Sequence, residues 1–121
     1  MRAVPALLAL VIGLAACGGD DAARRSQPAP KTDPGLKVWV AQGCGSCHTF
    51  APAGATATIG PNLGLSLGGR SRDYIRESIV APNARVPGGG TSIMPADFAK
   101  RISKPELDAL VKFIAEGVRA R

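Results

Sequence analysis

The clearest pattern of apolar and polar positions lies near the end of the chain, in SKPELDALVKFIAEGVRAR (103–121). Apolar residues recur there at the helical spacing i, i+3, i+4 and i+7, at Leu107, Leu110, Val111 and Ile114. Ser103 and Glu106 have the spacing of a capping box, and Pro105 suits the first turn of a helix. The pattern predicts an amphipathic helix that begins after Ser103, with Phe113 and Val118 widening its apolar face.

Two earlier segments are also predicted to form helices. Ser71 can cap the segment SRDYIRESIVAPNA (71–84) and Pro82 ends its helix. One face of this helix carries Tyr74, Ile75, Ser78 and Ile79. In DPGLKVWVAQG (33–43), Asp33 can cap a helix whose first position is Pro34. The apolar side of this first helix is expected from Leu36, Val38, Trp39 and Val40.

The segments between the predicted helices have no helical period. FAPAGATATIGPNLGLSLGGR (50–70) is rich in Gly, Pro and Ala, and RVPGGGTSIMPADF (85–98) is similarly irregular. Both are predicted to be loops, and the chain shows neither an internal repeat nor a strong strand pattern. The sequence therefore predicts an all-α domain over residues 35–121, which is small for an independent core.

The N-terminal segment does not fit this domain. MRAVPALLALVIGLAAC (1–17) has one positive charge at Arg2 followed by an apolar run. Such a run is typical of a signal peptide and is short for a membrane span. Leu14, two small residues and Cys17 look like a bacterial lipobox, in which the cysteine receives lipid and becomes the new N-terminus. We expect residues 1–16 to be removed and Cys17 to be lipidated; the alternative is a soluble exported protein with a free Cys17.

The segment after Cys17 joins this cysteine to the domain. GGDDAARRSQPAPKTDP (18–34) is rich in Pro, Ala and charge and has almost no large apolar residue. Because it cannot bury enough surface to fold, residues 17–34 are predicted to form a flexible tether. A lipid-anchored domain on such a tether would search the membrane surface for its partners. The expected location is the outer face of the cytoplasmic membrane or the periplasm.

The candidate chemistry lies in GCGSCHTF (43–50), which contains the single histidine of the chain. Cys44, Cys47 and His48 form C-x-x-C-H, the attachment signature of a c-type haem. Each thiol adds to a haem vinyl group to form a thioether, and the adjacent imidazole ligates the iron. The motif by itself leaves three alternatives: a redox dithiol, which does not need the histidine, a zinc site, which needs four ligands, and a chance match.

A second axial ligand for such an iron has few candidates. His48 is the only histidine, so a second histidine from the same chain is excluded. Met1 leaves with the signal peptide, which makes Met94 the only thioether of the mature protein. Met94 is followed by Pro95 and lies far enough along the chain to reach the other side of a haem. A His/Met pair is common in cytochromes c; the alternatives are a core methionine and a vacant or foreign sixth ligand.

Together these features resemble the class I c-type cytochromes, the small bacterial mono-haem type. The chain is similar also to the cytochrome c domain of some haem–copper oxidase subunits, over about residues 35–118. Gly35 and Trp39 match a glycine and an aromatic of the family's first helix, and Phe113 matches an aromatic of its last helix. The resemblance implies a cytochrome c fold in which these two helices cross closely around one covalent haem c.

Further matches surround the haem motif. Gly60, Pro61, Asn62 and Leu63 match the family's G-P-N-L. The resemblance implies that the Pro61 carbonyl accepts a hydrogen bond from the His48 ring nitrogen that faces away from iron. Gly69 and Arg70 match a Gly-Arg whose arginine meets a haem propionate; the alternative for Arg70 is a solvated loop charge. Met94 and Pro95 match the family's Met-Pro, but the glycine-rich PGGGTS (87–92) before them is a departure that would weaken the Fe–S bond.

The expected function follows from these ligands. Iron with two strong axial ligands has no open position and can only change charge between Fe(II) and Fe(III). We therefore expect a membrane-anchored electron carrier of a respiratory chain, not an enzyme, whose partners are redox proteins such as a terminal oxidase. One alternative is a haem subunit held permanently in a larger oxidoreductase complex. The other is a peroxidase-like or gas-binding haem protein in which Met94 does not ligate iron.

The charge of the chain bears on its partners. The formal net charge is +6, and residues 35–121 carry 11 basic and 6 acidic side chains. Most of these charges are expected to be solvated surface. Lys100 and Arg101 differ because they follow the Met94 loop, near where a class I fold exposes its haem edge. A basic rim there would steer the protein to an acidic patch on a redox partner; nucleic acid is not an expected partner.

Overall fold

The computed structural model of the protein describes residues 30–86 and 88–120. The predicted signal peptide, Cys17 and most of the predicted tether lie outside these residues. In chain order the helices are α2 (Pro34–Ala41), α3 (Leu63–Ser66), α4 (Arg72–Val80), α5 (Phe98–Arg101) and α6 (Lys104–Arg119). The fold is all-α, as the sequence predicts.

Minor elements join these helices. Three short 3₁₀ segments, η1 to η3, span Cys44–Ser46, Ala51–Ala53 and Pro82–Arg85. β1 (Thr49–Phe50) and β2 (Ala55–Thr56) form a small antiparallel hairpin in which Thr49 lies opposite Thr56. None of the helices formed by residues 30–86 and 88–120 is long and apolar enough to cross a membrane.

The three predicted helices begin at their predicted caps. The Asp33 carboxylate accepts hydrogen bonds from the backbone N–H groups of Gly35 and Leu36, at 2.7 and 3.0 Å. The Ser71 hydroxyl accepts one from the Tyr74 N–H at 3.1 Å. At α6 the Ser103–Glu106 capping box is present. The Ser103 hydroxyl and N–H both donate to the Glu106 carboxylate, at 2.6 and 2.9 Å, and these bonds hold the pKa of Glu106 below its usual range. Local side-chain chemistry therefore fixes where each of these helices starts.

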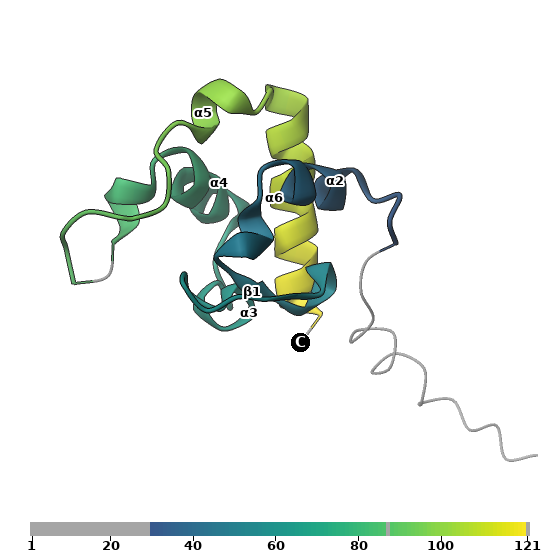
Figure 1. Cartoon of the computed structure of the whole chain (residues 1–121), viewed down its shortest axis with the longest axis horizontal. Helices are drawn as coiled ribbons and strands as arrows, with labels where there is room; N and C mark the ends of the chain where they lie inside the picture. Colours follow the sequence, from purple (N-terminus) through teal and green to yellow (C-terminus); the bar gives the residue numbers. More distant parts are fainter. Residues whose placement is uncertain (1–29, 87, 121) are drawn as a thin grey trace, which may run out of the picture.

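α2 crosses α6 (Figure 1), and the two helices meet at Gly35. Gly35 is buried, and a Cβ at this position would lie 2.3 Å from the Ala109 carbonyl oxygen and 2.3 Å from Phe113 Cβ. A side chain of any size would push the two helices apart. The close crossing of the first and last helices that the resemblance implies is therefore confirmed.

Three aromatic rings fill the space beside this crossing. The ring of Trp39 lies 5.3 Å from that of Phe50 and 6.3 Å from that of Phe113, centroid to centroid, and Phe50 lies edge-on to Phe113 at 5.6 Å. Phe50 is fully buried. The sequence pattern indicates Trp39 and Phe113 as helix residues but assigns Phe50 to a loop, so the third ring of the cluster was missed.

The structure corrects two further expectations. Val38 and Trp39 of the first helix are buried as expected, but Val40 is 69% exposed and Leu36 is only partly buried, and α2 buries Gly35 in their place. Gly35, Val38 and Trp39 follow the i, i+3, i+4 spacing set by the contact with α6. The first predicted loop contains the one-turn helix α3 and the strand β2, and β1 ends at its first residue. The one-turn helix α5 begins at the last residue of the second predicted loop. Elements of two to four residues are too short to show a period.

Figure 1 shows α4 and α5 beside α6, with α2 crossing it and α3 near the hairpin. Of the predicted apolar faces, Ile75 and Ile79 of α4 and Leu110, Val111 and Ile114 of α6 are buried. Tyr74, Ser78 and Leu107 of the same faces are only partly buried. Between these faces and the segments that carry C-x-x-C-H and Met94 lies a cavity.

Candidate functional site

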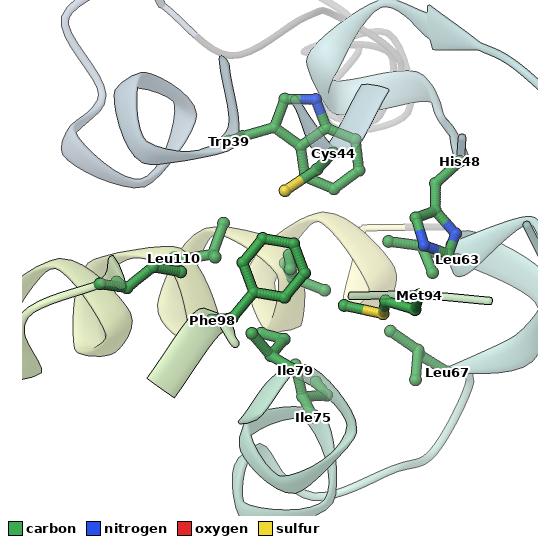
Figure 2. Close-up of a pocket in the computed structure, with 12 residues that line it drawn as sticks. Trp39, Cys44, His48, Leu63, Leu67, Ile75, Ile79, Met94, Phe98 and Leu110 are labelled. Atoms are coloured by element: carbon green, nitrogen blue, oxygen red, sulfur yellow. The ribbon is translucent and has the colours of Figure 1, made fainter. Parts of the chain in front are cut away.

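The central cavity is lined almost entirely by apolar side chains (Figure 2). Its lining residues are Trp39, Cys44, His48, Leu63, Leu67, Ile75, Ile79, Met94, Phe98, Ile102, Leu110 and Ile114. His48 carries the one imidazole among them, and Cys44 and Met94 carry the sulfur atoms. Aliphatic and aromatic walls with a few heteroatoms from separate segments suit a large apolar cofactor held at defined points.

His48 is oriented by the loop that follows it. Its Nδ1 lies 2.9 Å from the Pro61 carbonyl oxygen. A carbonyl oxygen can only accept, so Nδ1 carries the proton and donates this bond. The lone pair is then on Nε2, where a metal ion can use it. The hydrogen bond that the resemblance implies is present in the structure.

Gly60 allows the Pro61 carbonyl to approach the ring. A Cβ at position 60 would lie 2.7 Å from His48 Cε1 and 2.8 Å from Nδ1. The Gly60 N–H also donates to the Cys47 carbonyl oxygen at 2.7 Å, which holds the loop against the haem motif. Position 60, the glycine of G-P-N-L, must therefore lack a side chain, because any side chain there would displace the His48 imidazole.

One turn of backbone brings the motif residues together. Gly43, at φ 69°, adopts the left-handed conformation that favours glycine and leads into η1. The N–H groups of Cys47 and His48 both donate to the Cys44 carbonyl oxygen, at 3.3 and 3.1 Å. Figure 2 shows the Cys44 sulfur directed into the cavity. Cys47 is partly buried and does not line it.

The Cys44 thiol is unsuited to redox exchange. Cys44 and Cys47 are not joined by a disulfide, and burial raises the pKa of the Cys44 thiol to about 11. A redox C-x-x-C motif depends on an attacking cysteine whose pKa is lowered. The environment of Cys44 has the opposite effect, which argues against the dithiol alternative.

Met94 reaches the cavity from the segment between η3 and α5. Its N–H donates to the Ser92 hydroxyl at 3.1 Å, and the Ser92 N–H donates to Asn83 Oδ1 at 2.8 Å. The glycines 88–90 all have positive φ, at 78°, 80° and 96°. These glycines, in which the chain departs from the family, therefore form a turn whose backbone conformation other residues rarely adopt. His48 and Met94 extend into the same space from different segments (Figure 2).

The residues around Met94 are better packed than the sequence suggests. Phe98 is 5% exposed and Ile102 is 6% exposed, and both line the cavity. The composition of SIMPADF (92–98) does not indicate a core segment, yet Phe98 is buried. The spacing of Phe98 and Ile102, four residues apart, is the signal that could have found them.

The remaining predicted residues divide between the cavity and the surface. Leu63 lines the central cavity, whereas Arg70 is exposed and its guanidinium carbon lies 4.7 Å from the centre of the Tyr74 ring. Lys100 and Arg101 are exposed near Met94 in sequence, and Arg101 Nε lies 3.2 Å from Asp97 Oδ2. The propionate contact of Arg70 stays a prediction.

Comparison with known protein families agrees with this site. The family model described as Cytochrome c matches residues 32–117, which is most of the chain. The chain therefore belongs to the cytochrome c family and has its all-α fold. It is an electron-transfer haem protein that binds haem c covalently, typically one per domain. Neither the curated proteins nor the solved structures compared with the chain contain a match.

The residues present fit this cofactor. A haem needs apolar walls, two thiols one turn apart and a nitrogen lone pair for iron. The aliphatic lining, Cys44 and the Nε2 of His48 meet these needs at the cavity, and Cys47 follows one turn after Cys44 without lining it. Met94 adds a thioether that lines the same cavity.

Proposed function

We propose that this protein is a membrane-anchored, one-electron carrier of a respiratory chain. Cys44 and Cys47 would hold the haem covalently, and His48 and Met94 would ligate its iron. The observation that carries this proposal is that the His48 ring and the Met94 thioether enter the same apolar cavity from separate segments. A haem held in this way supplies reversible exchange of single electrons between Fe(II) and Fe(III).

The surrounding residues tune this exchange. The soft sulfur of Met94 favours Fe(II) and raises the midpoint potential relative to a second histidine. The apolar walls act in the same direction because they disfavour the additional charge of Fe(III). The Pro61 carbonyl keeps the His48 ring in one orientation, which limits reorganisation during electron transfer.

Replacement of Met94 tests this assignment. Met94→Ala is expected to remove the far-red charge-transfer band of the oxidised protein, lower the midpoint potential and let CO bind the reduced protein. Phe98→Leu, a conservative change in the same cavity wall, is the control and should keep the band. A wild type that binds CO readily and lacks the band would favour a gas-binding haem protein instead.

The anchor is part of the same proposal. Residues 1–16 would be removed as a signal peptide, and Cys17 would carry lipid at the end of a tether over residues 17–34. The support is the lipobox-like sequence and the polar composition of the tether. The protein would then act at the outer face of the cytoplasmic membrane, on redox partners fixed in that membrane.

Membrane fractionation tests the anchor. Cys17→Ser is expected to release the haem domain from membranes or to stall the precursor, and mass spectrometry of the wild-type N-terminus should show lipid on Cys17. A wild-type protein that is wholly soluble, with an unmodified N-terminus, would contradict the anchor but not the haem site.

A further inference from the structure

A second cavity, the arginine cavity, lies between the start of α4 and the last turns of α6. Its volume of about 260 Å³ far exceeds the roughly 10–15 Å³ that one water molecule needs. Its residues are Leu67, Gly69, Arg70, Ser71, Arg72, Ile75, Ala115, Val118 and Arg119. Apolar side chains and three arginines therefore share one site. Leu67 and Ile75 line the central cavity as well, so the two cavities have a common wall.

The three arginines come from two segments that are distant in sequence. Gly69, at φ 72°, turns the chain into the segment that carries Arg70 and Arg72. Arg119 comes from α6, and its Nε donates to the Ala115 carbonyl oxygen at 3.2 Å. Arg70 is held by the Tyr74 ring, 4.7 Å from its guanidinium carbon. A guanidinium has five N–H donors, so each of these contacts leaves donors free for a ligand.

Acidic side chains near the arginine cavity balance only part of this charge. Arg72 Nη2 lies 3.8 Å from Glu116 Oε1, too far for a hydrogen bond. Glu116 is also bonded to Lys112, at 3.2 Å, so a single carboxylate is divided between two cations. Asp73 adjoins Arg72 in the first turn of α4 but does not line the cavity. The cavity therefore has a positive potential, which the start of α4 reinforces.

We propose that the arginine cavity binds a phosphate group. Guanidinium groups bind phosphate oxygens through paired hydrogen bonds. Arg72 and Arg119 would supply these bonds, and Arg70, whose predicted partner is a haem propionate, would add to the positive potential. The apolar residues Leu67, Ala115 and Val118 would contact the substituent of a phosphate ester. The phosphate group would come either from free phosphate or from a phospholipid headgroup.

The shared wall predicts that this anion affects the haem. A phosphate in the arginine cavity places negative charge beside Leu67 and Ile75, which also line the haem cavity, and thereby stabilises the oxidised state. By linkage, the oxidised protein then binds phosphate more tightly than the reduced protein. We expect about a threefold difference in affinity, which for a one-electron couple lowers the midpoint potential by about 28 mV at saturation. This coupling rests on the proposed function, whereas phosphate binding itself does not.

Calorimetric titration of the full-chain holoprotein with inorganic phosphate, in a phosphate-free detergent at constant ionic strength, tests the site. The double variant Arg72→Gln, Arg119→Gln is expected to bind phosphate at least tenfold more weakly, because two charge-assisted contacts are lost. The double variant Lys37→Gln, Lys104→Gln removes the same charge outside the cavity and should bind like the wild type. A second titration, with dihexanoyl phosphatidic acid below its micellar range, identifies the source. Tighter binding of this lipid than of inorganic phosphate indicates a headgroup, and the reverse indicates free phosphate.

The absence of saturable binding of either ligand, or equal weakening in the two double variants, overturns the proposal. A midpoint potential that does not change at saturating phosphate overturns the coupling and leaves the binding site in place. An iron without a sulfur ligand would refute the proposed function, but it would not alter the calorimetric result. The two failures are therefore distinguishable.

Discussion

The residue at position 60 determines whether the Pro61 carbonyl can bond to the His48 ring. The Pro61 carbonyl fixes the proton on Nδ1, and only a glycine at position 60 lets that carbonyl approach the ring. The sequence identifies Cys44, Cys47 and His48 because thioether formation and ligation require their spacing. It does not explain Gly60, whose role depends on a contact across the loop. Phe50 and Phe98 are buried although they lie in predicted loops, which have no helical period to indicate a buried face.

A substitution at Gly60 tests this contact. In Gly60→Ala the new methyl group would overlap the His48 ring, so the ring or the loop must move. The Nδ1–Pro61 bond is then expected to weaken, and the midpoint potential to rise because a less basic imidazole stabilises Fe(III) less. Gly68→Ala is the control, since its Cβ would meet only the Leu65 carbonyl oxygen at an ordinary 3.7 Å. Equal potentials in the two variants would show that the contact does not tune the iron.

At the scale of elements, the helices that begin at a strong cap were predictable and the one-turn helices were not. Asp33, Ser71 and Ser103 act on the backbone within three residues, so their effect can be read from the sequence. The buried face of α2 was harder to predict. Leu36 and Val40 fit an apolar side, but the packing of Gly35 on α6 turns the helix so that Val40 is exposed.

The crossing of α2 and α6 should be the most sensitive helix contact to added volume. Gly35→Ala places a methyl group 2.3 Å from the Ala109 carbonyl oxygen, and overpacking of this kind costs about 1–3 kcal/mol. Thermal unfolding of the holoprotein, followed by far-ultraviolet circular dichroism, measures the loss. Gly68→Ala again serves as the control and should unfold close to the wild type. If both variants unfold alike, the crossing tolerates a side chain at position 35.

At the scale of the whole molecule, the domain carries a net positive charge, and its distribution decides which face meets a partner. Arg101 is partly balanced by Asp97 and stacks on Phe98, with its guanidinium carbon 4.4 Å from the ring centre. Lys100 is exposed beside it. The large apolar side chains of Ile93 and Ile59 are also exposed, next to the Met94 and Pro61 segments respectively. Docking through Lys100 and Arg101 would use basic steering.

Electron transfer to an acidic redox partner should therefore depend on salt. The second-order rate is expected to fall as ionic strength rises, because screening removes the steering. Lys100→Glu should slow it more than Arg101→Glu, since Arg101 already faces an acid, and both should leave the midpoint potential nearly unchanged. Lys112→Glu, which changes an exposed charge on α6, is the matched control. A second-order rate that changes neither with salt nor in any of the three charge-reversal variants would rule out docking through Lys100 and Arg101.

The central claim is that His48 and Met94 ligate the iron together, and X-ray absorption at the iron edge of the oxidised wild-type holoprotein tests it most directly. We expect six-coordinate iron with five nitrogen ligands and one sulfur ligand, the sulfur coming from Met94. Iron with nitrogen ligands only, or with five ligands and an open position, would contradict it.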